Sequence, residues 1–279
     1  MSGIAPDPRL IVPTMAELPL ASRIGVITGA TSGIGRAIAE RLIAQGARVV
    51  VNGRRKDKLD ESVKALNSGR REPAAVGVMG DCAEPAVIEG LFAAAKKHFG
   101  ADADAVVVNA GRGLAGGVLS SDTSQWEEMI RTNMLGAARL MRAAAEKMLA
   151  AIGVDPAPDV WQKRAHDIVV IGSVVGRHVS PFSSMYGSTK FGVHGMTEGL
   201  RREVASKGIR VTLVEPGFVV SEFQGVAGYK EEWFRGVVEK IGPVLKPEDV
   251  ARPVAFVLAQ PANVHVSDVL IRPTRQDYP

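Results

Sequence analysis

The sequence predicts an α/β protein in which a doubly wound parallel sheet carries helices on both faces. Short, uniformly apolar and β-branched runs are typical of strands that are covered on both sides. These runs alternate along the chain with stretches of helical period, which is the order expected for parallel strands joined by helices. The predicted strands are residues 24–27, 47–52, 74–79, 105–108, 167–172 and 266–271.

Size and composition fit one globular domain. The chain has 279 residues, near the limit of roughly 250–300 at which a single core divides. A hydrophobic content of 46% and a charged content of 23% are ordinary, and no apolar run approaches the ~18 residues of a membrane span. The net charge of +4 comes from dispersed Lys and Arg residues, so we expect neither a nucleic-acid partner nor a membrane partner.

Cysteine content and the first residues bear on location. Cys82 is the only cysteine, which excludes an internal disulfide and a cysteine metal cluster, and no metal site is predicted. A reducing, cytoplasmic environment fits this content. Residues 1–21 hold four prolines and lack the apolar core of a secretory signal. We expect them to form a flexible N-terminal arm ahead of a domain that spans residues 22–279.

The first predicted strand leads into a glycine-rich turn and then a helix. Gly29, Gly33 and Gly35 stand between the strand and the helical pattern that starts at Ala37. Glycine permits a sharp turn and close approach of a bulky anion, and the N-terminus of the next helix favours phosphate. A tight strand-to-helix connection could need glycine for its own sake, but its place at the start of an alternating α/β chain favours a dinucleotide site.

The end of the second strand bears on which dinucleotide binds. An acidic residue there holds the ribose hydroxyls of NAD, whereas an arginine accommodates the 2′-phosphate of NADP. The sequence has Asn52, Gly53, Arg54 and Arg55 at this point and no acid. Because a guanidinium pairs well with phosphate, the pattern favours NADP over NAD, although the two arginines could simply be solvated at a helix start.

The third and fourth strands also end in residues suited to a cofactor. A helix over residues 57–66 precedes the third strand, which leads to Asp81 and Cys82. Asp81 could accept a hydrogen bond from the adenine amine or cap the helix that starts near Glu84. After that helix, which runs to about His98, the fourth strand leads to Asn109, Ala110 and Gly111, and these small residues let the backbone pass close to the cofactor.

The helical spacing of apolar residues over 121–151 predicts one long helix, which contains Asn133. Asparagine is disfavoured within a helix, so Asn133 needs a reason such as a polar kink or an ordered water, unless it is a plain surface residue. Residues 152–166 have two prolines and no steady period, which predicts a surface loop.

The fifth strand is followed by Ser173 and by a helix that runs to about Ser206. Tyr186 and Lys190 lie four residues apart on this helix, so both side chains share one face. A nearby ammonium lowers the pKa of a phenol, which would make Tyr186 a general acid/base, and Ser173 could hydrogen-bond a substrate oxygen. Alone, Ser173 could simply belong to a turn, and Tyr186 and Lys190 could simply share one face of a helix. Together with the glycine-rich turn, the three residues favour a catalytic site.

This set of motifs resembles the short-chain dehydrogenase/reductase family over about residues 22–272. The motifs are Thr28-Gly-x-x-x-Gly-x-Gly35, Asn109-Ala-Gly111, Asn133, Ser173, Tyr186-x-x-x-Lys190 and Pro216-Gly217. The resemblance implies a single-domain Rossmann fold with a seven-stranded parallel sheet, and a homotetramer or homodimer. It also implies a catalytic tetrad of Asn133, Ser173, Tyr186 and Lys190, in which Asn133 holds a water and Lys190 binds the nicotinamide ribose.

The turns and the resemblance together assign residues to the cofactor. These are Thr28, Gly29, Thr31, Ser32, Gly33, Ile34, Gly35, Gly53, Arg54, Arg55, Asp81, Cys82, Asn109, Ala110, Gly111, Tyr186, Lys190, Pro216, Gly217, Val219 and Ser221. Two positions depart from the usual family pattern: Val108 replaces an asparagine, and Ser221 replaces a threonine whose hydroxyl it retains. Neither change threatens activity.

Residues 217–246 correspond to the stretch that closes over substrate in the family, and they are rich in aromatic residues. This predicts an apolar or aromatic pocket wall, unless the rings only pack the lid on the body. The predicted pocket residues are His178, Phe182, Phe218 and Phe223. The end of the chain, with a helix over residues 248–259, is similar to the subgroup of the clavulanate-pathway aldehyde reductase and the NADP-dependent hydroxy-acid (serine-type) dehydrogenases.

The sequence therefore predicts an NADP(H)-dependent oxidoreductase that transfers a hydride between nicotinamide and the carbonyl or alcohol group of a small, partly apolar molecule. A 3-oxoacyl-thioester reductase is an alternative enzyme, but it would need a basic docking surface that dispersed Lys and Arg residues do not define. A regulator that senses NADP without turnover is a second alternative. The intact Ser173, Tyr186 and Lys190 argue against it, since a sensor needs no acid/base group.

Overall fold

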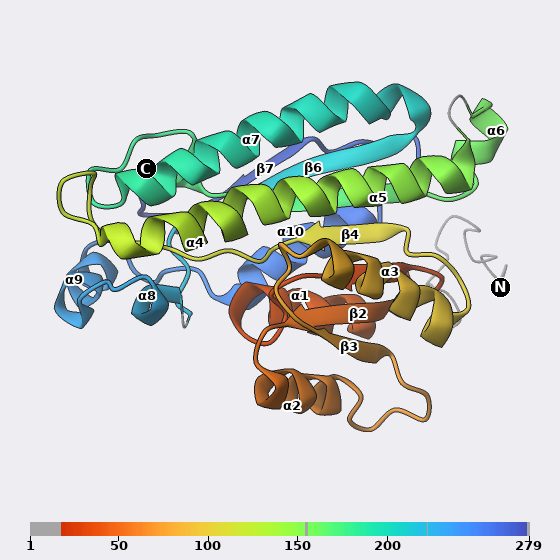
Figure 1. Cartoon of the computed structure of the whole chain (residues 1–279), viewed down its shortest axis with the longest axis horizontal. Coiled ribbons are helices and arrows are strands. Elements are labelled where there is room, and N and C mark those ends of the chain that lie inside the picture. Colours follow the sequence, from red (N-terminus) through yellow and green to blue (C-terminus); the bar gives the residue numbers. More distant parts are fainter. Residues whose placement is uncertain (1–17, 154–155, 222, 278–279) are drawn as a thin grey trace, which may run out of the picture.

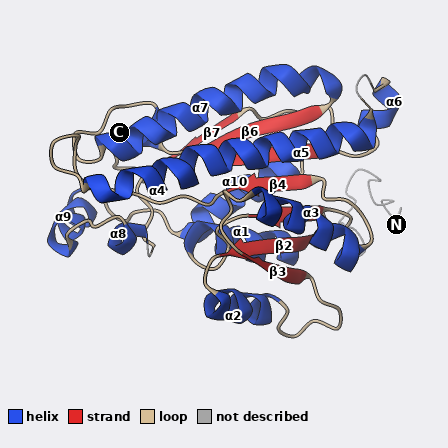
Figure 2. Cartoon of the chain, viewed as in Figure 1, coloured by secondary structure: helices blue, strands red, loops and turns tan. Residues whose placement is uncertain are grey.

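The computed structural model describes residues 18–153, 156–221 and 223–277, which form one seven-stranded parallel sheet with helices on both faces (Figures 1 and 2). The strand order is β3-β2-β1-β4-β5-β6-β7, so the predicted doubly wound arrangement is confirmed. The strands are β1 (Ile24–Ile27), β2 (Arg48–Gly53), β3 (Ala75–Met79), β4 (Ala105–Val108), β5 (His166–Ile171), β6 (Ile209–Pro216) and β7 (Asp268–Ile271).

Two apolar cores lie on opposite faces of the sheet because successive strand residues point to opposite sides. In β4, Val107 packs into one core while Val106 and Val108 pack into the other. The first core is closed by α1 (Gly33–Ala44), α2 (Lys56–Leu66) and α10 (Pro247–Leu258). The second is closed by α3 (Pro85–Phe99), α5 (Ala137–Ile152) and α7 (Ser184–Val204). Parallel strands buried on both faces explain the uniformly apolar runs.

The described parts of the predicted N-terminal arm and of the loop predicted over residues 152–166 each contain a short ordered turn. Residues 1–17 of the arm lie outside the described residues, but Leu18–Ala21 form a turn and Leu20 is only 1% exposed. The backbone N–H of Leu20 donates to the carbonyl of Gln45, which fastens this turn beside α1. In the loop, a single-turn helix, α6 (Pro158–Trp161), stands between α5 and β5.

The helix predicted over residues 121–151 is not continuous. A 3₁₀ turn (Thr123–Gln125) leads into α4 (Trp126–Ile130), a π-helical segment spans Arg131–Gly136, and α5 follows. Asn133 lies in this wider π-helical turn. The helix is therefore interrupted at the asparagine, as expected for a polar kink. Such segments are frequent at functional sites.

The amino-terminal edge of the sheet carries a buried network of opposite charges. Arg23 contacts Asp104 at 3.0 Å and Asp167 at 2.6 Å, and Arg210 contacts Asp167 at 2.7 Å. All four residues are at most 8% exposed. The network ties the starts of β1, β4, β5 and β6 together, at the opposite edge from the predicted active site. No helix in the described part of the chain is long and apolar enough to cross a membrane.

Candidate active site

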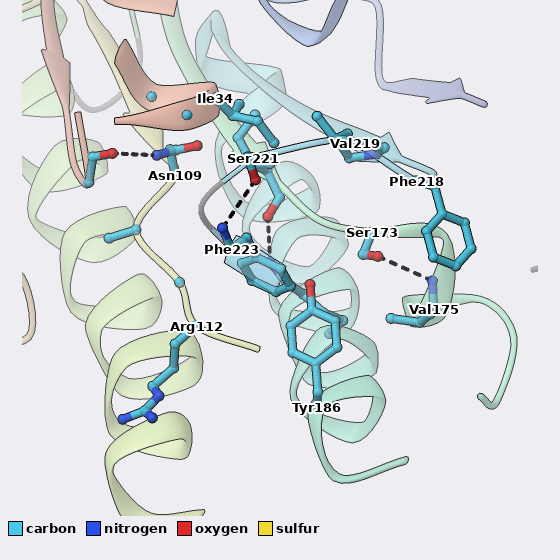
Figure 3. A pocket seen from close by; sticks show the side chains of 18 of the residues that line it. Ile34, Asn109, Arg112, Ser173, Val175, Tyr186, Phe218, Val219, Ser221 and Phe223 are labelled. Carbon is cyan, nitrogen blue, oxygen red and sulfur yellow. Dashed lines mark hydrogen bonds between the residues drawn. The ribbon is translucent and has the colours of Figure 1, made fainter. Parts of the chain in front are cut away.

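A cavity of about 670 Å³ opens at the carboxyl-terminal edge of the sheet and brings most of the predicted site residues together (Figure 3). Ligands bind at this edge in open α/β sheets. The predicted residues that line it are Gly29, Thr31, Ser32, Gly33, Ile34, Gly35, Gly53, Arg54, Arg55, Asp81, Cys82, Asn109, Ala110, Gly111, Ser173, Phe182, Tyr186, Lys190, Pro216, Gly217, Phe218, Val219, Ser221 and Phe223. Thr28, Asn133 and His178 are the predicted residues outside this lining.

The glycine turn forms one wall of the cavity. Gly29 and Gly33 adopt positive φ values of 64° and 52°, which glycine tolerates best. A Cβ atom on Gly35 would collide with the carbonyl oxygen of Gly29, so the tight turn needs glycine there. Ser32 precedes α1 and its side chain makes no capping hydrogen bond, which leaves the first N–H groups of α1 available to a ligand. This wall therefore fits a dinucleotide pyrophosphate.

The loop after β4 is fastened to this turn rather than merely passing beside it. The side-chain amide of Asn109 donates to the carbonyl oxygens of Thr28 (2.9 Å) and Gly29 (3.1 Å). In return, the Thr28 hydroxyl accepts from the backbone N–H groups of Asn109 and Ala110, each at 3.2 Å. Thr28, 1% exposed, thus joins two cofactor-facing loops instead of lining the cavity itself.

Arginine side chains gather beyond the end of β2. Arg54 pairs with Glu128 of α4 at 2.7 Å, and Arg112 also pairs with Glu128. Arg55 lines both the main cavity and a second cavity of about 250 Å³, which Thr31, Ser32, Gly33, Arg36, Lys58 and Glu61 complete. Arg36, Arg55 and Lys58 outnumber Glu61 in this second cavity, which together with the glycine turn makes it suited to an anion.

Asp81 and Cys82 lie on the floor of the cavity. Asp81 accepts a hydrogen bond from the backbone N–H of Ala83 at 2.9 Å and pairs with Arg131 at 3.2 Å. It therefore stabilises the turn before α3 and does not cap α3, whose N-cap is Glu84. Burial raises the pKa of the Cys82 thiol to about 11, so the thiol is protonated at neutral pH.

Asn133 lies beside the cavity with its amide engaged by protein groups. Its Oδ1 accepts from the backbone N–H of Arg112 at 2.8 Å, and its Nδ2 donates to the Arg112 carbonyl (2.9 Å) and the Thr189 hydroxyl (3.0 Å). These bonds join the π-helical segment to the loop after β4 and to α7. The reason for an asparagine within a helical stretch is therefore this three-way bridge.

Ser173, Tyr186 and Lys190 come together from β5 and α7. The Ser173 hydroxyl accepts from the backbone N–H of Val175 at 3.4 Å and lies near enough to Tyr186 to lower the pKa of its phenol. Figure 3 shows both hydroxyls in the pocket, with the ring of Phe223 beside Tyr186. The two ring centres lie 5.6 Å apart. Lys190 donates from Nζ to the carbonyl oxygen of Ile171 at 2.8 Å.

The predicted effect of Lys190 on the pKa of Tyr186 is wrong for this structure. Burial raises the pKa of Tyr186 above its ordinary value, and the nearby Ser173 hydroxyl opposes this rise only in part. The ammonium of Lys190 bonds to a strand carbonyl and lies 5.9 Å from the centre of the Tyr186 ring. Burial also lowers the pKa of Lys190 to about 8.

Aromatic side chains line the far end of the cavity. Trp233, on α9 (Glu231–Ile241), stacks on Tyr229 at 4.9 Å, and its ring centre lies 6.1 Å from both Phe182 and Phe218. Phe223 begins the short helix α8 (Phe223–Val226). His178, predicted to line this pocket, is instead exposed and outside the cavity lining in the described chain.

The two ends of the segment 218–245 lie side by side. Val219 pairs with Leu245 in a parallel bridge, where Leu245 donates to the Phe218 carbonyl at 2.9 Å and Val220 donates to the Leu245 carbonyl at 2.8 Å. The Ser221 hydroxyl accepts from the backbone N–H of Phe223 at 3.3 Å, so it shapes the entry to α8 (Figure 3).

Some lining residues were not predicted from the sequence. Arg112 directly follows the Asn109-Ala110-Gly111 motif, so adjacency alone could have flagged it. Lys240 and Asp277 line the cavity from α9 and the C-terminal segment, and no local pattern marks either of them. They join the site only through tertiary folding.

Known proteins are similar to this chain in sequence and in fold. The sequence matches the short chain dehydrogenase family over residues 23–232. An uncharacterized oxidoreductase of Staphylococcus saprophyticus is 32% identical over 254 residues, which cover 91% of this chain and 98% of the relative. A similar oxidoreductase of Staphylococcus epidermidis is 32% identical over 251 residues, with 90% and 97% coverage.

Solved structures lead to the same class. The closed form of serine dehydrogenase in complex with NADP⁺ superposes with a TM-score of 0.78 at 29% identity, covering 91% of this chain and 96% of that chain. An alcohol dehydrogenase from Thermococcus sibiricus in complex with 5-hydroxy-NADP gives a TM-score of 0.74 at 26% identity, with 92% and 99% coverage. The fold and the dinucleotide cavity thus define an NAD(P)-dependent oxidoreductase. The chain belongs to the short-chain dehydrogenase family.

Proposed function

We propose that this protein is an NADP(H)-dependent oxidoreductase that interconverts a carbonyl and an alcohol, with Tyr186 as general acid/base. The observation that carries the proposal is that the side chains of Tyr186 and Ser173 line the same cavity as the glycine turn. A proton donor and a dinucleotide wall in one cavity are what hydride transfer to a carbonyl requires.

The residues of the chain divide the work as follows. The Tyr186 phenol is protonated at neutral pH and is a group in the cavity that can donate a proton to a carbonyl oxygen in the reducing direction. Ser173 orients that oxygen, and Lys190 binds the ribose next to the nicotinamide. Asn133 holds the loop after β4 against α7, because it bonds to Arg112 in that loop and to Thr189 on α7. The bound nicotinamide supplies or accepts the hydride.

The preference for NADP rests on the basic corner after β2. Arg54 and Arg55 line the cavity, and Lys58 and Arg36 line its neighbour beside the glycine turn. Arg54→Ala should weaken NADPH binding more than NADH binding, measured by fluorescence titration of both cofactors. Equal weakening of the two would show that Arg54 does not contact the 2′-phosphate.

The aromatic end of the cavity favours a small substrate with an apolar part. The rings of Phe182, Phe218 and Trp233 lie where they can contact such a group. Two structural neighbours are serine dehydrogenases, so hydroxy acids remain in the panel of compounds to be tested.

The decisive experiment is NADPH consumption with a panel of aldehydes, ketones, β-keto esters and 3-oxoacyl thioesters, together with NADP⁺ reduction by hydroxy acids. Tyr186→Phe should lower turnover by about 10²–10⁴ while the NADPH affinity stays close to that of the parent. Turnover that survives this substitution would refute the acid/base role. Consumption with the thioesters alone would favour the 3-oxoacyl-thioester reductase, and tight NADPH binding without any consumption would favour the sensing regulator.

The proposal extends to a cytoplasmic homotetramer. Ile130 and Phe191 are 42% and 43% exposed on the α4 and α7 side, and Phe256 and Leu270 are 57% and 40% exposed on α10 and β7. Two apolar faces on different sides of one chain suit two dimer contacts. Light scattering should give four chains for the parent and two for Phe256→Glu. A monomeric parent would refute both contacts.

A further inference from the structure

A backbone group of Ser173 is bonded to a histidine that lies outside the cavity lining. The pairing of β5 with β6 ends at Ile171 and Val214, and Gly172 donates the last interstrand bond to the Val214 carbonyl at 2.7 Å. The next N–H, that of Ser173, points instead at Nε2 of His194 at 3.3 Å. His194 lies on α7 four residues after Lys190, on the face that also carries Tyr186.

Two glycines make room for the His194 ring. A Cβ atom on Gly172 would stand 2.5 Å from Nε2 of His194, and a Cβ atom on Gly176 would collide with the same ring. The ring therefore fits against the backbone on both sides of Ser173 only because neither position has a side chain. The contact between the His194 ring and the Ser173 loop therefore depends on these two glycines.

The charges around His194 fix its tautomer. Since Nε2 accepts a hydrogen bond, the ring proton lies on Nδ1, which faces Oε2 of Glu215 at 3.6 Å. Glu215 is fully buried, and Arg177 neutralises it through two hydrogen bonds of 2.5 Å each. A buried carboxylate that orients an imidazole in this way selects one tautomer.

The ring stays neutral over the working pH range. The pKa of His194 is lowered to about 4, with burial as the largest cause and the positive charges of Lys190 and Arg177 as the next, while Asp268 opposes them. Asp268 also lies 3.3 Å from Arg177, so the carboxylates and cations facing the ring form one connected group. A neutral ring keeps its lone pair available to the Ser173 N–H.

We propose that His194 is a positioning residue, whose Nε2 acceptor holds the Ser173 backbone and so sets where the Ser173 hydroxyl stands relative to Tyr186. The inference rests on the proposed function, because positioning has a kinetic meaning only if Ser173 orients the substrate oxygen. His194 touches neither the cavity nor the predicted cofactor wall among the described residues. Its loss should therefore act on kcat and leave NADPH binding alone.

The kinetic test compares two substitutions of this side chain. His194→Leu removes the acceptor and leaves the Ser173 N–H unpaired, which should lower kcat about tenfold with KM and NADPH affinity nearly unchanged. His194→Gln places Oε1 near the position of Nε2 and should recover most of kcat. His98→Leu, on the exposed side of α3, is the matched control and should behave as the parent. An equal loss of kcat in both His194 variants, or a loss in NADPH affinity instead, would overturn the proposal.

A second measurement does not depend on turnover. The ¹⁵N-edited spectrum of the 5 histidine rings should show two rings as the Nδ1–H tautomer at neutral pH. One is His194, and the other is His166, whose Nδ1 donates to the Arg164 carbonyl at 3.1 Å. One of these two signals should vanish in His194→Gln. Detection of His194 as the Nε2–H tautomer would overturn the inference even if the enzyme is active. A parent protein that consumes no NADPH but shows the Nδ1–H tautomer at His194 would refute the proposed function and leave this arrangement supported.

Discussion

Glu128→Gln should increase the affinity for NADPH while leaving that for NADH unchanged. Arg54, the proposed contact of the 2′-phosphate, pairs with Glu128 at 2.7 Å, and its hydrogen bond holds the pKa of that carboxyl below its ordinary value. Glu128 is therefore charged at neutral pH and competes with phosphate for the guanidinium. The substitution removes the competing charge and keeps the size of the side chain.

The size of the effect follows from the exposure of the pair. The Arg54 and Glu128 side chains are 61% and 46% exposed, and ion pairs in such surroundings contribute ~0.2–1 kcal/mol. Release of Arg54 should therefore tighten NADPH binding by at most about fivefold, and less at high salt because screening already weakens the pair.

Fluorescence titration of NADPH and NADH at two salt concentrations measures this effect. Glu127→Gln is the matched control, because it makes the same change of charge at the exposed neighbouring position on α4. If NADH binding tightens equally, or if Glu127→Gln gives the same gain, the change reflects overall charge and the competition between Glu128 and phosphate is refuted.

Three further predictions concern stability and substrate choice. Asp167→Asn should lower the free energy of unfolding by about 3–5 kcal/mol in urea denaturation, because it leaves buried Arg23 and Arg210 short of a partner charge; a loss below about 1 kcal/mol would contradict this. Since the folded-state pKa of His194 is about 4 against an ordinary 6.5, the unfolded chain binds more protons between these values. The melting temperature should therefore fall as pH drops through this window, and less steeply in His194→Gln; parallel curves would refute the assignment. Trp233→Ala should lower kcat/KM about tenfold for an aromatic aldehyde and little for acetaldehyde, and equal losses would exclude a ring contact.

The sheet could be predicted because its signals are local. Strands covered on both faces, such as residues 105–108, read as unbroken apolar runs, and the turn after β1 needs glycine for reasons visible in its own sequence. The same holds for the pairing of Tyr186 with Lys190 on one helix face, since four residues span about one turn.

What the sequence did not predict depends on distant partners. Asn133 was marked as unusual, but its reason lies in Arg112 and Thr189, which are 21 and 56 residues away. The pKa of Tyr186 was assigned the wrong direction because spacing along α7 says nothing about burial. His178 was predicted to line the pocket and does not, whereas His194, which no local pattern marked, contacts the Ser173 backbone from 21 residues downstream.

The bridge between Val219 and Leu245 has a consequence for how new substrate preferences can arise. Because Val219 and Leu245 pair with each other, the segment between them can change in length and sequence without displacing β6 or α10. The proton donor lies on α7, and Phe223 is the residue of this segment whose ring packs beside it, 5.6 Å away. We expect that transplanting residues 224–244 from a relative, with Phe223 kept, would re-rank the accepted carbonyls while kcat for a shared minimal aldehyde is retained. The residues that recognise the substrate can thus be exchanged as one segment, while the residues that carry out the chemistry stay in the rest of the fold.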